Sequence, residues 1–198
     1  KSITVPGDMS YAEWYKQYVQ GNPKAEANEK AIKNEQSDKK QFEQYRSVLG
    51  DHAPKSLVSF QRMKYNEPEK WADLKKTYRE VNWQKQAQQN GIVRGSEHGV
   101  PYEGIPDTVF DNYKNGVLDS RRYYGRTGKP RLDIDMTDHK NPKKHPVVPH
   151  RHGWTELDNG RMKRSTNHDE ALTTSEKIAN ADILEGGSGN ERRKTGKS

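Results

Sequence analysis

The 198-residue chain contains no cysteine. This absence excludes disulfide bonds, thiolate zinc sites and cysteine nucleophiles, but it does not identify the cellular compartment. Apolar residues are also few, since 29% of the chain is hydrophobic and 32% is charged. Ordinary globular chains are about 45–50% apolar on a count that includes glycine. We therefore expect a small hydrophobic core, a large solvated surface and some disorder.

Long apolar runs are absent as well. No run reaches the roughly 18 apolar residues of a membrane span, and the N-terminus lacks the apolar centre of a signal peptide, so we expect no membrane partner. The charge, by contrast, is unbalanced, because 35 lysines and arginines exceed 28 aspartates and glutamates and give a formal net charge of +7. Such an excess favours a polyanionic partner such as RNA or DNA, although structural and ribosomal-type proteins share it.

Residues 1–90 have the composition of a helical arm or carrier region. Ser10 and Glu13 form a capping-box pattern, which predicts the start of a short aromatic helix. The stretch 23–49 is rich in lysine, glutamate, glutamine and alanine and has sparse apolar positions, which predicts a long exposed helix. From Pro68, aromatic and aliphatic residues recur three and four positions apart, which predicts an amphipathic helix.

Residues 91–107 are dense in glycine and proline, and this composition predicts a hinge between two modules. Beyond the hinge, Asn115-Gly116 is a strong hairpin-turn signal. Residues 108–184 are therefore predicted to form a small module of antiparallel strands, closed by a last helix near 169–184. The basic, Gly/Ser-rich residues 185–198 predict a disordered tail. The expected fold class is α+β, with a helical N-terminal half.

The residues suited to chemistry gather between Arg121 and Trp154. From 121 to 152, nine lysines and arginines stand against three aspartates, a net charge of +6, while the whole chain carries +7. Four of the seven histidines also lie here, at His139, His145, His150 and His152. If the chain has an active site, we expect it in this segment.

Three of these histidines lie among prolines, which hold the backbone extended, so that His150 and His152 project to the same side. A neutral imidazole is a natural general base near neutral pH, and an imidazolium is a natural acid. His145, His150 and His152 are therefore candidate catalytic residues. The alternative is a scaffold role, in which they hydrogen-bond the free carbonyls of the proline-rich loop.

Arg121 and Arg122 complete the candidate catalytic set, as clamps for a phosphate. Because neighbouring residues of a strand face opposite ways, only one of the two can point at a ligand unless the strand bulges. Four further cations are the candidate nucleic-acid-binding residues: Lys143, Lys144, Arg131 and Arg151.

A metal site is a further alternative. Asp133 and Asp135 share one face of a predicted strand and could hold a divalent ion together with His139 or His152. We instead expect these aspartates to pair with arginines across the hairpin. On that prediction the protein needs no metal and no other cofactor, because the surrounding cations already supply positive charge.

Two stretches resemble known families. The opening VPGDMSYAEWYKQYV and the NPKAEANEKAIKN arm after it are similar to the segment that follows the conserved domain of phage minor head (head-morphogenesis) proteins. The second stretch resembles C-terminal modules of bacterial polymorphic toxins, which also occur as tails on such head proteins. It carries RRYY, DIDxTDH, NPKxHP and VPHxHxW at 121–124, 133–139, 141–146 and 148–154. Lys140 stands where the toxin modules usually have glycine.

The toxin resemblance implies cleavage of nucleic acid and an immunity protein as partner. We expect a metal-independent endoribonuclease, in which a base deprotonates the ribose 2′-hydroxyl, an acid protonates the leaving 5′-oxygen and a fixed cation stabilises the phosphorane-like charge. The head-protein resemblance implies portal or capsid partners and a place in the virion, whereas a free toxin would act in the bacterial cytoplasm. The alternative prediction is a non-catalytic region of a minor head protein that contacts portal, capsid and packaged DNA.

Overall fold

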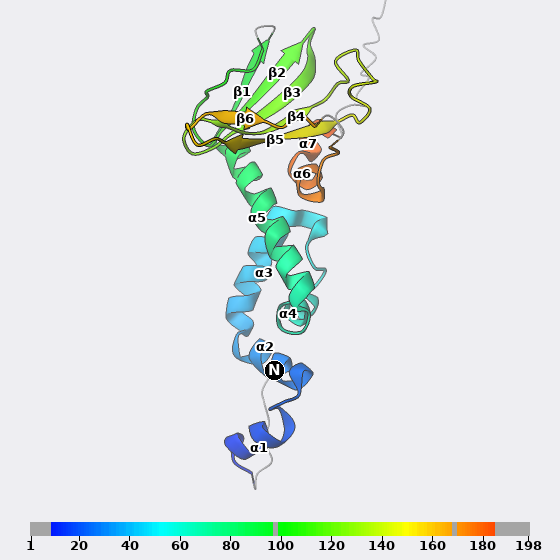
Figure 1. Cartoon of the computed structure of the whole chain (residues 1–198). Helices are drawn as coiled ribbons and strands as arrows, with labels where there is room; N and C mark the ends of the chain where they lie inside the picture. The colour runs from blue at the N-terminus through cyan, green and yellow to red at the C-terminus, as the bar shows by residue number, and fades with distance from the viewer. Residues whose placement is uncertain (1–8, 97–98, 168–169, 185–198) are drawn as a thin grey trace, which may run out of the picture. The chain divides into compact units, whose positions relative to one another are not determined.

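The computed structural model describes residues 9–96, 99–167 and 170–184, and the chain divides into two compact units (Figure 1). Unit 1 is Lys1–Glu80 and unit 2 is Val81–Ser198. The fold class is α+β, as predicted. The boundary between the units falls inside a helix and not in the glycine- and proline-rich segment 91–107.

Within the described ranges the chain forms seven α-helices, one short 3-10 helix and six strands. The helices are α1 (Tyr11–Tyr18), α2 (Pro23–Lys33), α3 (Glu35–Leu49), η1 (Gly50–His52), α4 (Leu57–Asn66), α5 (Pro68–Asn90), α6 (Thr174–Ala179) and α7 (Ala181–Leu184). The strands are β1 (Ile92–Ser96), β2 (Val109–Lys114), β3 (Val117–Tyr124), β4 (Pro130–Asp135), β5 (His150–Glu156) and β6 (Met162–Arg164). The expected disordered tail, 185–198, lies outside the described residues. Of the helices just given, none has the length and apolar character needed to cross a membrane.

Unit 1 is built around one stripe of α3. Phe42, Tyr45 and Leu49 recur three and four positions apart and are buried. Aromatic side chains of α4 and α5 cover this stripe, with the Tyr45 ring stacked on Tyr78 at 4.1 Å and packed against Phe60 at 5.4 Å between centroids. These contacts give unit 1 its own small aromatic core.

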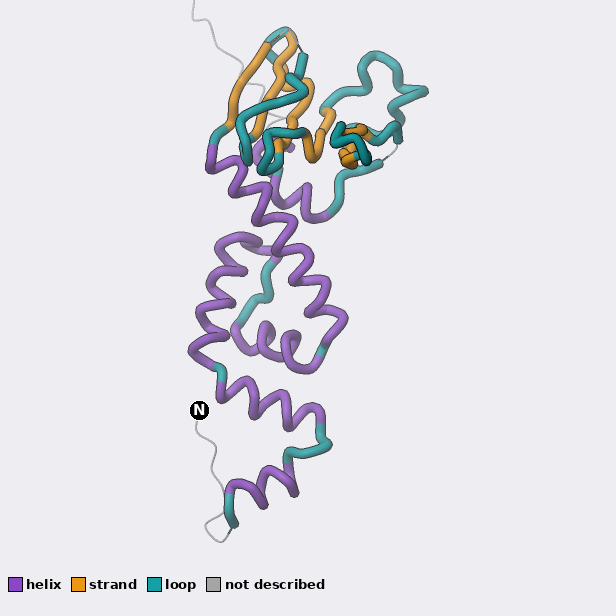
Figure 2. Tube along the Cα trace, turned by 60° about the vertical axis from the view of Figure 1, so that its left-hand side comes forward, coloured by secondary structure: helices purple, strands orange, loops and turns teal. Residues whose placement is uncertain are grey.

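The prediction of one long exposed helix over 23–49 is wrong. The chain breaks at Asn34 into α2 and α3, and Figure 2 shows the break as a short loop. Apolar residues are sparse in this stretch, but the helical spacing of those in α3 places them on one face. Three large side chains on a single face are enough to pack against partner helices.

Unit 2 contains one six-stranded sheet with the strand order β1-β2-β3-β4-β5-β6. Strands β2, β3, β4, β5 and β6 pair with one another in this order, and each of these pairs is antiparallel. The turn between β2 and β3 is Asn115-Gly116, and both residues have positive φ, 51° and 76°. Two successive residues with positive φ suit the turn that closes a tight hairpin, so this prediction is confirmed.

Strand β1 makes the sheet mixed, because it pairs in parallel with β2. The predicted hinge over 91–107 is therefore wrong at this strand, whereas the described strands of the predicted module, 108–184, are all antiparallel to one another. The β-branched pair Ile92 and Val93 favours a strand over a hinge. Gly95 allows close approach to β2, since a Cβ at this position would lie 2.2 Å from the Phe110 ring.

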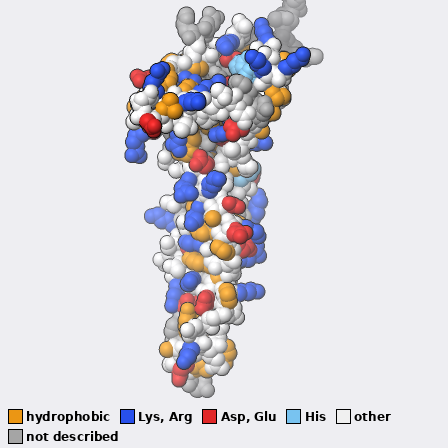
Figure 3. All heavy atoms as spheres, viewed as in Figure 1, with side chains coloured by type: hydrophobic (Ala, Val, Ile, Leu, Met, Phe, Trp, Pro, Cys, Tyr) orange, Lys and Arg blue, Asp and Glu red, His pale blue; other side chains and the backbone are white. Residues whose placement is uncertain are grey.

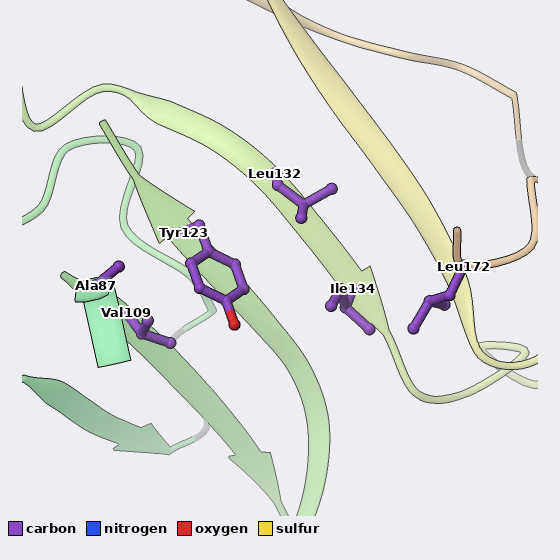
Figure 4. Close-up of a cluster of buried hydrophobic side chains, with 6 residues drawn as sticks. All are labelled: Ala87, Val109, Tyr123, Leu132, Ile134 and Leu172. Carbon is purple, nitrogen blue, oxygen red and sulfur yellow. The ribbon is translucent and has the colours of Figure 1, made fainter. Parts of the chain in front are cut away.

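One face of the sheet carries the hydrophobic core of unit 2 (Figure 4). The predicted last helix over 169–184 is instead two short helices, and Thr173 caps the first of them in a capping box with Glu176. Trp83 and residues of α7 pack against the core. The buried members of this core are Ala87, Val109, Tyr123, Leu132, Ile134 and Leu172.

Candidate active site

Asp133 and Asp135 alternate along β4 with apolar core residues, so they point to the opposite face of the sheet. On the neighbouring strand β5, His152 is the register partner of Asp133, and His150 is the register partner of Asp135. Directly opposed residues on neighbouring strands share a face. The two strands alone therefore bring two aspartates and two histidines together, and all four are buried.

His139 and His145 reach the same place from the loop 136–149, which joins β4 to β5. His139 has φ 51° and Lys140 has φ 61°, a left-handed backbone that non-glycine residues rarely adopt. With this turn, His139 Nε2 lies 3.2 Å from Asp135 Oδ2. The ring of His145 lies edge-on to the ring of His139, with 4.9 Å between centroids.

Asp135 Oδ2 is the centre of this group. His150 Nε2 and His152 Nε2 each lie 3.5 Å from that oxygen, close to the 3.2 Å of His139. His145 Nδ1 lies 3.3 Å from His150 Nε2. We call these five residues, Asp135, His139, His145, His150 and His152, the histidine cluster.

Electrostatics keep the carboxyl group of Asp135 ionised. Burial alone would raise its pKa, but hydrogen bonding to His152 and the positive charge of Arg164 outweigh burial and hold the pKa well below its usual range. Burial also lowers the pKa of the His150 imidazole, and the neighbouring histidines act in the same direction, against the attraction of Asp135. The centre of the cluster therefore combines a carboxylate with an imidazole that favours its neutral form.

The hydrogen position on His152 follows from its backbone neighbour. His152 Nδ1 lies 2.8 Å from the carbonyl oxygen of Ser165, which can only accept, so Nδ1 carries a hydrogen. With that hydrogen on Nδ1, Nε2 directs a lone pair toward Asp135 when the ring is neutral, and it can donate to the Asp135 carboxylate only when the ring carries both hydrogens. His139 has a similar outer contact, with Nδ1 3.3 Å from the Thr137 hydroxyl oxygen.

Arg121 does not lie in the histidine cluster. It is only 1% exposed and forms ion pairs with Asp111 at 2.7 Å and Asp182 at 2.9 Å. Its register partner on β4 is Ile134, so its side chain shares the core face of the sheet. Desolvation would lower the pKa of this guanidinium, but the two aspartates reverse the effect and raise it. The predicted phosphate clamp at Arg121 is therefore corrected to a buried structural ion pair.

Arg122 lies on the same face of the sheet as the cluster, but its guanidinium is already bound to a carboxylate. Its guanidinium binds both oxygens of Asp133, at 2.7 and 2.8 Å, and donates to the carbonyl of Pro101 at 3.0 Å. This pairing confirms the expectation that an aspartate of β4 pairs across the hairpin. It also means that Arg122 cannot clamp a phosphate without giving up Asp133.

The four predicted nucleic-acid-binding cations fall into two groups. Lys143 and Lys144 are exposed on the loop that carries His139 and His145, and in Figure 3 histidine surface lies beside lysine and arginine near the top of the view.

The other two cations are placed differently. Arg151 is bound to Glu176 at 2.7 Å and to Glu170 at 3.0 Å. Arg131 lies over the Trp83 ring, 3.9 Å from its centroid. The structure therefore groups only the two lysines with the histidines.

Arg164 is a residue of the candidate site that the sequence did not point to. From β6 it binds Asp133 Oδ2 through Nε and Asp135 Oδ2 through Nη2, each at 2.7 Å. It lies 29 residues from Asp135 in a polar stretch without a recognisable motif. The alternating pattern of β6 was the one local signal, and it is only three residues long.

Comparison of the chain with protein-family models, with curated proteins and with solved structures gave no match. The resemblance to phage head proteins and toxin modules therefore stays a prediction.

Proposed function

We propose that unit 2 cleaves phosphodiester bonds in nucleic acid at the histidine cluster, with RNA as the expected substrate. The observation that carries this proposal is the convergence of three imidazoles on the buried carboxylate of Asp135, with a fourth, that of His145, in contact with His150. Groups that exchange protons near neutral pH are what cleavage of a phosphodiester requires. Such a concentration is costly for a merely structural role, because buried polar groups weaken a core unless they are fully satisfied.

The exposure of the histidines divides their roles. His150 and His152 have 0% exposed surface, so they support the site and do not contact a substrate directly. His145 is only partly buried, lies on the loop and contacts His150. We therefore assign proton transfer to His145. It takes the proton of the attacking hydroxyl as the new P–O bond forms, and the departing 5′-oxygen receives a proton from solvent as its bond to phosphorus breaks.

The loop 136–149 binds the nucleic acid. Lys143 and Lys144 are exposed next to His145 and can meet the phosphates that flank the scissile bond. Point charges of this kind position a nucleic-acid strand without reading its sequence. The proposal therefore predicts cleavage with little sequence preference.

A cleavage assay tests this proposal directly. The full chain is incubated with total RNA and with plasmid DNA, both as purified and after addition of zinc, manganese or magnesium. His145→Gln should lower the cleavage rate by about 10²–10⁴-fold, the usual contribution of a proton-transfer group, while affinity for RNA stays within a few-fold. The matched control is His52→Gln, because His52 is an exposed histidine of unit 1. This substitution should not change the cleavage rate.

Two outcomes would contradict the proposal. If the folded wild-type chain cleaves neither RNA nor DNA under any of these conditions, the catalytic role fails and a non-catalytic head-protein region is the better explanation. If His145→Gln cleaves as fast as wild type, the proton carrier has been assigned to the wrong residue.

A further inference from the structure

We infer that Asp135, His139, His150 and His152 form a binding site for one divalent transition-metal ion of the zinc type. This inference deepens the proposed function and rests on it for the role of the ion in cleavage. The binding of the ion itself is argued from the geometry of the cluster alone.

The distances from Asp135 Oδ2 to the other three assigned ligand atoms suit a tetrahedral site. Zinc binds imidazole nitrogen and carboxylate oxygen at about 2.0–2.2 Å, so neighbouring ligand atoms of a tetrahedron lie roughly 3.3–3.6 Å apart. Asp135 Oδ2 lies 3.2 Å from His139 Nε2 and 3.5 Å from the Nε2 atoms of both strand histidines. One ligand atom from each of Asp135, His150 and His152 lies within 4.8 Å of the others, and the same limit holds within the group of His139, His145 and His150.

The outer contacts of the imidazoles have the pattern seen around metal ligands. A histidine that binds a metal through one ring nitrogen usually donates the hydrogen of its other nitrogen to a nearby oxygen. His152 Nδ1 donates to the carbonyl oxygen of Ser165 at 2.8 Å, which directs Nε2 toward Asp135. His139 Nδ1 lies beside the hydroxyl oxygen of Thr137 at 3.3 Å, and its Nε2 also faces Asp135.

The two strand histidines lie close together in the buried part of the cluster. The ring centroids of His150 and His152 lie 5.1 Å apart, and neither side chain has exposed surface. A single divalent ion can bind neutral rings and the carboxylate of Asp135 at once. Arg164 holds that carboxylate in position at 2.7 Å, as an outer contact that orients a ligand.

The ligand types select the class of ion. Three imidazoles and one carboxylate suit zinc and its neighbours in the first transition series, whereas magnesium and calcium prefer ligand sets made of oxygen. The exposed surface of His139 leaves one side of the site open toward the loop. An ion there would supply the positive charge at the reacting phosphate that Arg121 and Arg122, bound to aspartates, do not provide.

The test is metal binding by the full chain, measured without any substrate. The protein is treated with EDTA, freed of chelator and titrated with Zn²⁺ in a calorimeter; Co²⁺ is added in parallel, because four-coordinate Co²⁺ has strong visible absorption bands. Wild type should bind one ion per chain. His139→Gln, an exposed loop variant that should fold normally, should lower Zn²⁺ affinity by more than about 100-fold, since even outer contacts contribute 10–100-fold.

Three further variants test the assignment. Asp135→Asn should lower Zn²⁺ affinity similarly, and its folding is checked by circular dichroism. His145→Gln and the distant control His52→Gln should bind Zn²⁺ within about threefold of wild type, because neither residue is an assigned ligand. Failure of the folded wild-type chain to bind one Zn²⁺, or undiminished binding by His139→Gln, would overturn the inference.

The two proposals can fail separately. If the chain binds one Zn²⁺ through the assigned ligands but cleaves neither RNA nor DNA, the result supports the metal site and contradicts the proposed function. If the chain binds no Zn²⁺ and still cleaves nucleic acid in EDTA, the result supports the nuclease and contradicts the metal site.

Discussion

Arg122 and Asp133 face each other from β3 and β4 and form a bidentate ion pair, with N–O distances of 2.7 and 2.8 Å. Both residues are buried, and the guanidinium lies 4.8 Å from the centroid of the Trp154 ring. Arg164 binds the same carboxylate and also reaches Asp135. Asp133 is therefore the link between this ion pair and the histidine cluster.

Removing Asp133 should destabilise unit 2. Asp133→Ala leaves the buried guanidinium of Arg122 without its carboxylate, and breaking a buried ion pair from one side costs about 3–5 kcal/mol. Asp133→Asn should cost less, because the amide oxygen still accepts one hydrogen bond. Urea unfolding of the two variants measures both values. A loss below about 1 kcal/mol for Asp133→Ala would mean that the pair does not form in solution.

Arg121 should behave as a structural residue in a double-mutant cycle. Arg121→Met leaves Asp111 buried and unpaired and should lower the free energy of unfolding by about 3–5 kcal/mol. Adding Asp111→Leu removes the stranded charge and should recover most of that loss, because well-packed apolar replacements of buried pairs are often neutral. Urea unfolding of both variants checks this. If Arg121→Met instead lowered only cleavage and left stability unchanged, Arg121 would belong to the catalytic site after all.

Local patterns predicted the parts of the structure that depend on neighbours in sequence. The Ser10–Glu13 capping box and the Asn115-Gly116 turn are both present, because each is set within four residues. The common orientation of His150 and His152 also follows from strand alternation alone. These features required no knowledge of the rest of the chain.

Long-range pairings could not be predicted in the same way. Nothing local shows that β4 and β5 align Asp135 with His150, because the 14-residue loop between the strands permits other registers. The Arg121–Asp182 pair could not be predicted for the same reason, because the two residues are 61 positions apart in the sequence. The sequence therefore identified the residues of the histidine cluster but assigned Arg121 to a phosphate-binding role, although it is buried against Asp111 and the distant Asp182.

The loop lysines should control affinity for nucleic acid. Replacing Lys143 and Lys144 with alanine removes two exposed charges and should weaken binding to RNA and DNA alike. The salt dependence should flatten, since each lost phosphate contact changes the slope of log K against log salt by about 0.7–0.9. The matched control replaces Lys39 and Lys40, an exposed pair in α3. Equal affinities for the two double variants at low salt would show that this loop is not the binding surface.

Lys140 should be a strained residue whose replacement by glycine stabilises the loop. Its φ of 61° costs a non-glycine residue roughly 1–2 kcal/mol, and glycine avoids this cost. Part of the gain is lost, because glycine makes the unfolded chain more flexible by about 0.4–1 kcal/mol. Lys140→Gly should therefore be more stable than wild type by about 0.5 kcal/mol.

Lys140→Ala is the matched control for that measurement, because it removes the same exposed side chain and keeps the strained backbone. Urea unfolding should rank Lys140→Gly above both wild type and Lys140→Ala, with the last two close together. If alanine is as stabilising as glycine, the gain comes from losing a positive charge beside Lys143 and Lys144. In that case Lys140 is not held in the left-handed conformation, and the turn that directs His139 toward Asp135 needs another explanation.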